Sequence, residues 1–152
     1  MQQMRICVDS MRAELAHAVA HPGRRTSIVN VSSINGLGAA PRAPYYSAVK
    51  AAQIALTKSA AIDYAADGVR VNAIVLGAFD TPLLAQAYAR ISGGDEAIAN
   101  AIRQQFLGLV PLGRIGAPEE AARAIAWLCS GESSYVTGAS WVVDGGITAF
   151  AR

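Results

Sequence analysis

Hydrophobic and polar residues follow two different periods along the first half of the chain, and the change of period predicts helices separated by strands. Residues 4–20 run into a Pro-Gly pair, which predicts a helix that ends there. Its apolar residues, at helical spacing, are Ile6, Met11, Leu15, Ala18 and Val19. The β-branched run SIVNVSS, residues 27–33, indicates a buried strand. Pro44 then begins a long alanine-rich helix, for which Gly68 is the expected C-terminal cap.

The second half of the chain continues this alternation. VRVNAIVL, residues 69–76, predicts a second strand, and residues 83–109 predict one or two helices interrupted at Gly93 and Gly94. The segment 117–131 has proline and two glutamates at its start and glycine at its end, as a helix does. ASWVVDGG supplies a last strand and a turn. Strands that alternate with helices predict an α/β fold with a parallel sheet and no domain boundary within residues 1–152.

Composition narrows the class of protein. With 152 residues, 53% hydrophobic and 16% charged, the chain can bury the core of one domain. The net charge of +2 is spread along the chain, so neither a nucleic acid nor a membrane is an expected partner. The charged N-terminal region leaves no signal-peptide core, and we expect a cytoplasmic protein. Cys7 and Cys129 fit no redox or zinc spacing and are expected to be small buried hydrophobes.

Two further clusters raise the question of a metal, and we expect none. His17 and His21 are four residues apart and could share a helix face, but no third ligand lies nearby in the sequence. A solvated helix end is therefore the expected state of this pair. Asp144, followed by two glycines, indicates a turn.

Hydroxyl side chains follow the predicted strands. In open parallel sheets, ligands bind beyond the carboxyl ends of the strands. Ser32 and Ser33 end the first predicted strand, Thr81 follows the second, and Tyr46 lies near the start of the intervening helix. The sheet pattern alone thus gathers several polar groups at one edge.

Tyr46 and Lys50 are four residues apart and share one face of their helix, whereas Tyr45 projects away from it. A nearby ammonium lowers the pKa of a phenol, as a general acid acting on a carbonyl oxygen requires. Ser33 could donate a hydrogen bond to the same oxygen. Such a spacing also arises by chance on helix surfaces, and Ser33 could equally cap a turn, so spacing alone leaves both interpretations open.

The motifs taken in order resemble the short-chain dehydrogenase/reductase family. Ser33 in NVSS precedes Tyr46 by thirteen residues, and YSAVK is similar to the family's Tyr-x-x-x-Lys. GVRVNAIVLGAFDTPLL and PLGRIGAPEEAARAIAWLCSGESSYVTGASWVVDGG are similar to its later segments. The second of them looks most like the bacterial group of 3-oxoacyl-carrier-protein reductases and sugar or alcohol dehydrogenases. The resemblance spans residues 26–147. It implies the last three strands, with flanking helices, of a doubly wound Rossmann-like parallel sheet.

The resemblance also implies a function, which is hydride transfer between NAD or NADP and a carbonyl or alcohol. Tyr46 would be the general acid or base, Lys50 would bind the nicotinamide ribose, and Ser33 would position the substrate carbonyl. The implied cofactor contacts are Tyr46, Lys50, Gly77, Phe79 and Thr81. Residues 83–109 would form a substrate lid, and the implied substrate-lining residues are Ser33, Leu83, Leu84 and Tyr88. Full-length relatives would be homodimers or homotetramers.

The chain departs from the family pattern at several positions, and these departures lead to a second hypothesis, that the chain is a partial domain. The glycine-rich loop that cradles the dinucleotide pyrophosphate is not found in the sequence, since Gly36 and Gly38 follow the serine strand instead. Leu76 replaces the usual proline, and no asparagine precedes Asn30 to act in the family's proton relay. We therefore expect a single partial NAD(P)-binding domain, 1–152, without its N-terminal dinucleotide-binding half and with an unpaired strand edge.

The sequence leaves two alternatives to an active reductase open. The chain could be an inactive C-terminal fragment, or a dimerisation module that uses the small residues Ala51, Ala52 and Ala55. We expect little or no activity from it alone. A serine hydrolase is disfavoured, because no Gly-x-Ser-x-Gly elbow surrounds Ser33 and both histidines precede it on one helix.

Overall fold

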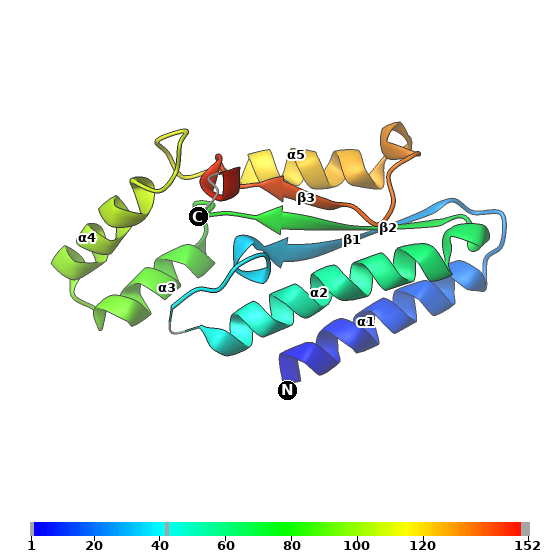
Figure 1. Cartoon of the computed structure of the whole chain (residues 1–152), viewed down its shortest axis with the longest axis horizontal. Coiled ribbons are helices and arrows are strands. Elements are labelled where there is room, and N and C mark those ends of the chain that lie inside the picture. The colour runs from blue at the N-terminus through cyan, green and yellow to red at the C-terminus, as the bar shows by residue number, and fades with distance from the viewer. Residues whose placement is uncertain (1, 42, 150–152) are drawn as a thin grey trace.

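Three parallel strands form one sheet in the order β1-β2-β3 (Figure 1). The computed structural model describes residues 2–41 and 43–149. Strand β1, Thr26–Ser33, pairs with β2, Val69–Leu76, over all eight positions. Strand β3, Ser140–Val143, pairs with β2 from Ala73 to Leu76. All three carboxyl ends therefore point to the same end of the molecule, as the sequence predicts.

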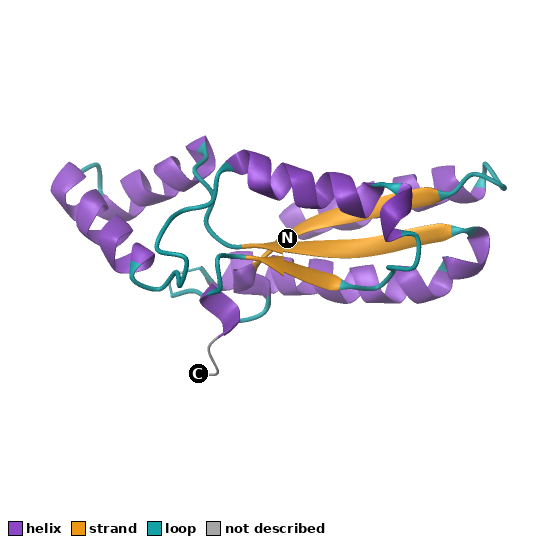
Figure 2. Ribbon diagram, turned by 90° about the horizontal axis from the view of Figure 1, so that it is seen from above, coloured by secondary structure: helices purple, strands orange, loops and turns teal. Residues whose placement is uncertain are grey.

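Helices cover both faces of this sheet (Figures 1 and 2). Helices α1, Gln2–Val19, and α2, Pro44–Asp63, lie on one face, and α5, Pro118–Cys129, lies on the other. Helices α3, Pro82–Ser92, and α4, Glu96–Leu107, pack on each other beyond the carboxyl ends of the strands. This arrangement is the predicted α/β fold with a partial doubly wound sheet, which confirms the predicted fold class.

The core gathers around the central strand. In β2, Val71, Ala73, Ile74 and Val75 are all fully buried, as expected for a parallel strand covered on both faces. Helix α1 buries one stripe, at Met11, Leu15 and Ala18, against the beginning of β1 and β2 and against Ala60 and Ala61 of α2. The spacing of four and then three residues is what a single helix face presents to a core.

The predicted end of the long helix that starts at Pro44 needs correction. The α-helix α2 ends at Asp63, and Gly68, with φ of +76°, closes a separate 3-10 turn, Ala65–Asp67. Glycine is required there because other residues rarely adopt positive φ.

The predicted burial of the two cysteines is wrong. Cys129 is exposed and Cys7 only partly buried, so neither is a buried hydrophobe. At the end of α5 the core position belongs to Leu128, and a helix turns the next residue about 100° away.

The prediction of a break near residue 93 is confirmed. Gly93 ends α3 with φ of +65°, and Gly94 also has positive φ. Asp95 then caps α4 by accepting a hydrogen bond from the backbone N–H of Ile98 at 3.1 Å.

Among the described residues, no helix combines the length and apolar character that crossing a bilayer requires.

Strand β1 has a free edge on the side away from β2. The backbone N–H of Thr26 donates to Gly68, so Thr26 and every second residue after it face β2. Val31 belongs to the other set, so its backbone N–H and carbonyl face the free edge, and the residue is 42% exposed. The expected unpaired edge is therefore present in the part of the chain that the structure describes.

Candidate active site

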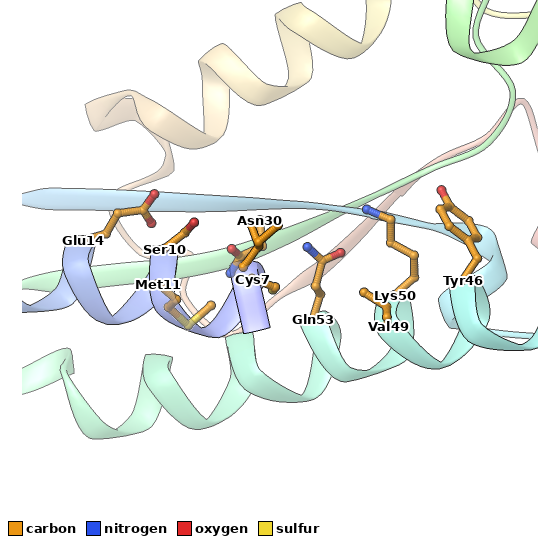
Figure 3. Close-up of a pocket in the computed structure, with 10 residues that line it drawn as sticks. Cys7, Ser10, Met11, Glu14, Asn30, Tyr46, Val49, Lys50 and Gln53 are labelled. Atoms are coloured by element: carbon orange, nitrogen blue, oxygen red, sulfur yellow. The ribbon is translucent and has the colours of Figure 1, made fainter. Parts of the chain in front are cut away.

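Tyr46 and Lys50 lie together on the first turns of α2. The Lys50 Nζ atom is 5.6 Å from the centre of the Tyr46 ring. Both side chains extend from the helix toward β1 (Figure 3). Tyr45, by contrast, is 85% exposed. The structure thus separates the two neighbouring tyrosines as their helical positions predict.

The Lys50 ammonium is also attached to the sheet. Its Nζ atom donates a hydrogen bond to the carbonyl oxygen of Val31 at 2.8 Å. Burial lowers the pKa of Lys50, and the nearby Cys7 thiol acts in the opposite direction. The hydroxyl of Ser32 donates to the backbone carbonyl of Lys50 at 2.9 Å, which fastens this turn of α2 to β1.

Ser33 lies at the carboxyl end of β1 and is buried. Its Oγ accepts a hydrogen bond from the backbone N–H of Asn35 at 3.2 Å and caps the 3-10 turn Ile34–Gly36. That turn packs closely on α2, because a Cβ at Gly36 would lie 2.7 Å from the Lys50 carbonyl carbon. Ser33 therefore ends its strand beside the helix of Tyr46 and Lys50, and it performs the turn-capping role that the sequence left open.

The predicted cofactor residues after β2 form a tightly packed loop. Gly77 continues the pairing with β3 through its N–H to Val143 O at 3.0 Å, and a Cβ there would meet Asp144 at 2.7 Å. Phe79 is buried and bridges to Gly116. The Thr81 hydroxyl caps α3 by accepting from the backbone N–H of Leu84 at 3.3 Å.

The predicted substrate-lining residues of α3 differ in exposure. Leu83 is 72% exposed, whereas Leu84 and Tyr88 are partly buried. The Tyr88 hydroxyl is buried and has no hydrogen-bond partner among the described residues. Burial raises the pKa of Tyr88, and Arg103 of α4 opposes that shift. The Tyr88 phenol is therefore desolvated within the segment predicted as a lid, where α3 packs on α4.

A cavity of about 360 Å³ lies between α1, α2 and β1 (Figure 3). It connects Tyr46 and Lys50 with side chains that sequence reasoning did not join to them. Its lining residues are Ile6, Cys7, Ser10, Met11, Glu14, Asn30, Tyr46, Val49, Lys50 and Gln53. Cys7, Ser10 and Glu14 are three and four residues apart, so the sequence alone indicates that they share one helix face. Only the packing of α1 on α2 shows that this face lies beside Tyr46 and Lys50.

Two further polar side chains, Asn72 and Asp144, hold backbone segments in place. The fully buried Asn72 donates to Val136 O at 2.8 Å and accepts from the Ala139 N–H at 3.0 Å. The Asp144 carboxylate accepts from the Gly146 N–H at 2.8 Å and from the Thr148 N–H and hydroxyl at 2.7 Å. Partial burial would raise the pKa of Asp144, but these hydrogen bonds lower it overall.

The two histidines stack, with ring centroids 4.3 Å apart, and His21 Nδ1 lies 2.7 Å from the carbonyl oxygen of His17. Within residues 2–41 and 43–149, no group of three or more His, Cys, Asp or Glu side chains is placed to hold a metal ion. Both histidines are exposed; His17 lies in the last turn of α1, and His21 follows the end of that helix.

Comparison with known proteins identifies the family. Residues 1–148 match the family described as enoyl-(acyl carrier protein) reductase. A cis-4-hydroxycyclohexanecarboxylate dehydrogenase from Sinomonas cyclohexanicum is 47% identical over 135 residues, which are 88% of this chain and 50% of that protein. A 3beta-hydroxysteroid dehydrogenase 1 from Eggerthella lenta is 44% identical over 81% of this chain and 44% of its own length.

Solved structures agree with this assignment. A short-chain dehydrogenase/reductase family oxidoreductase from Burkholderia thailandensis superimposes with a TM-score of 0.81 and 36% identity, over 96% of this chain and 53% of that one. Ligand-free aldohexose dehydrogenase from Thermoplasma acidophilum superimposes with a TM-score of 0.77 and 36% identity, over 88% of this chain and 51% of that one. The chain belongs to the short-chain dehydrogenase/reductase family of oxidoreductases, and it spans about half the length of the curated relatives it matches.

Proposed function

We propose that this chain carries the catalytic part of an NAD(P)-dependent reductase or dehydrogenase, with Tyr46 as its general acid or base. The observation that carries the proposal is the placement of Lys50 Nζ 5.6 Å from the Tyr46 ring, in a member of this oxidoreductase family. A phenol and an ammonium on adjacent helix turns form an acid–base pair that can act on a carbonyl or alcohol oxygen.

The residues present fit the nicotinamide end of such a cofactor. An ammonium has three N–H donors, and Lys50 uses one of them on Val31 O, which leaves donors for the hydroxyls of a ribose. For the pyrophosphate end, the glycines after β1 do not offer a comparable set of donors. Gly36, for example, is packed against the backbone of Lys50 and is not free to approach a phosphate.

In the proposed reduction, a bound nicotinamide supplies the hydride that adds to the carbonyl carbon. Tyr46 donates its phenolic proton to the carbonyl oxygen as the alcohol forms, and it takes the proton back when the reaction runs as an oxidation. Lys50 holds the ribose and places positive charge beside the phenol. Ser33 would donate its hydroxyl hydrogen to the substrate oxygen, while its Oγ lone pair continues to accept from Asn35.

The segment after β2 has two proposed roles. Gly77, Phe79 and Thr81 form the loop beside the nicotinamide. Residues 83–109, which contain all of α4 and all of α3 except Pro82, form the substrate lid, with Leu83, Leu84 and Tyr88 as its lining. Because relatives are named for a hydroxycyclohexanecarboxylate and a 3β-hydroxysteroid, alcohols on small and fused rings are the first substrates to test.

The test compares the purified 152-residue chain with a chimera. In the chimera, the half of the Sinomonas dehydrogenase that this chain does not match precedes the chain. We expect turnover of cyclic alcohols with NAD or NADP from the chimera and little from the chain alone, since positioning of the nicotinamide needs the phosphate contacts. A folded chimera that binds nucleotide but catalyses no oxidation or reduction would contradict the proposal.

A further inference from the structure

Residues 110–117, here called the strap, connect α4 to α5 and are fastened to the ends of two strands. The Leu112 N–H donates to Gly145 O at 3.1 Å in the turn after β3. The Gly116 N–H donates to Ala78 O at 3.1 Å, and the Asp80 N–H donates to Gly116 O at 2.9 Å. The strap therefore forms a short parallel bridge with the loop that carries Phe79.

Gly116 is the closest point of this contact. A Cβ at Gly116 would lie 2.7 Å from two carbon atoms of the Phe79 ring, so the ring packs directly on the glycine backbone. Phe79 itself is only 9% exposed. The position of the Phe79 side chain thus depends on where the strap holds Gly116.

A bidentate ion pair closes the strap onto α5. The two terminal nitrogens of Arg114 donate to the two carboxylate oxygens of Glu120, each at 2.7 Å. Glu120 Oε2 also accepts from the Ala117 N–H at 2.8 Å. The hydrogen bond from Arg114, followed by that from Ala117, lowers the pKa of Glu120 to about 2, so the carboxylate is ionised at neutral pH. The Arg114–Glu120 ion pair is here called the clamp, and Gly116 lies between these two residues in the sequence.

We propose that Arg114 and Glu120 are positioning residues, which hold Gly116 against Phe79 and thereby fix the loop of residues 77–81 at the nicotinamide. The assignment of that loop to the nicotinamide rests on the proposed function. Exposed ion pairs contribute little to global stability, but paired hydrogen bonds of this kind restrict geometry. The clamp therefore acts on the local order of the strap and the Phe79 loop.

Amide hydrogen exchange of the 152-residue chain tests the clamp directly. Glu120→Ala should speed exchange of the Asp80 amide by about tenfold while the Ala73 amide in β2 stays unchanged. Glu119→Ala is the matched control, because it removes an exposed carboxylate from the same helix turn and should change neither amide. Arg114→Lys keeps the positive charge but removes the two parallel guanidinium hydrogen bonds, and should give an intermediate rate of exchange at the Asp80 amide. Equal acceleration of both amides, or of neither, overturns the clamp.

The chimera with the Sinomonas dehydrogenase half tests the link to catalysis. There, Glu120→Ala should raise KM for the nicotinamide nucleotide by about fivefold and leave KM for the alcohol within twofold. An unchanged nucleotide KM overturns the positioning role. If the unmutated chimera has no activity, the proposed function has failed, and the exchange rates of Asp80 and Ala73 still decide whether the clamp exists.

Discussion

The ammonium of Lys50 donates to the carbonyl oxygen of Val31 at 2.8 Å, and that carbonyl belongs to the free edge of β1. Lys50 is thus held by the sheet edge as well as by its own helix. Since its Nζ atom also lies 5.6 Å from the Tyr46 ring, the charge beside the phenol is placed by both elements. A strand that paired with this edge would compete with Lys50 for the same acceptor.

Burial of Lys50 predicts a pH-dependent stability. Because burial lowers its pKa below the ordinary 10.5, the unfolded chain binds the proton more tightly than the folded chain. The free energy of unfolding of the native protein, relative to that of Lys50→Met, should therefore rise as pH increases toward 10.5. Urea unfolding at neutral pH and near that value measures this difference.

The control for this prediction is Lys58→Met, which removes an exposed lysine from the same helix. Both variants and the native chain should also carry Cys7→Ser, because the Cys7 thiol acts on Lys50 in the opposite direction. If Lys50→Met and Lys58→Met show the same pH dependence, Lys50 is not desolvated in the way the structure indicates.

Tyr46→Phe should abolish most of the activity of the chimera. Loss of a general acid or base lowers kcat by about 10²–10⁴-fold, and phenylalanine keeps the ring in place. Tyr45→Phe is the matched control, since Tyr45 is 85% exposed, and it should stay within about twofold of the unmutated protein. Equal effects of the two substitutions would show that the phenol of Tyr46 does no chemistry. Steady-state kinetics with a cyclic alcohol measures both.

Asn72→Ala should destabilise the fold strongly. The side chain is fully buried and bridges Val136 O and the Ala139 N–H, so its loss leaves two backbone groups unpaired. The expected cost is about 2–5 kcal/mol in the free energy of unfolding. Asn100→Ala, at an exposed position of α4, is the control and should be close to neutral. Denaturant unfolding measures the difference, and a neutral Asn72→Ala would remove Asn72 from the structural residues.

Local patterns were enough to predict the elements and their class. The β-branched runs identified β1 and β2, and helical spacing placed Tyr46 and Lys50 on one helix face. Of the apolar positions that predicted α1, Met11, Leu15 and Ala18 are buried, but Ile6 and Val19 are exposed. These features depend on residues close in sequence. The motif series added the family, which the comparisons confirm.

Contacts between distant segments were not readable in the same way. Nothing in the sequence around Phe79 indicates that Gly116 packs against its ring, nor that Lys50 reaches the Val31 carbonyl. Cys129 was expected inside because cysteine is usually buried, but its position next to Leu128 on α5 turns it outward. Tertiary packing decides each of these outcomes, and it overrides residue type.

Tyr88→Phe should stabilise the chain. The Tyr88 hydroxyl is buried and finds no partner among the described residues, so the native protein loses its hydration without compensation. Its removal should raise the free energy of unfolding by about 1 kcal/mol. Tyr135→Phe, at a fully exposed position, should have no effect in the same thermal or urea unfolding experiment. A destabilised Tyr88→Phe would mean that the hydroxyl has a partner in solution.

The same residue predicts a change at high pH. Burial raises the pKa of Tyr88 above its ordinary 10.0, with Arg103 opposing, so the folded chain holds the phenolic proton more tightly than the unfolded chain. Titration of Tyr88 leaves the free energy of unfolding unchanged well below 10.0 and lowers it as pH rises from 10.0 through the raised pKa. The advantage of Tyr88→Phe over the native chain should therefore grow in that range. An advantage that is constant with pH would show that the phenol is as solvated in the folded chain as in the unfolded one.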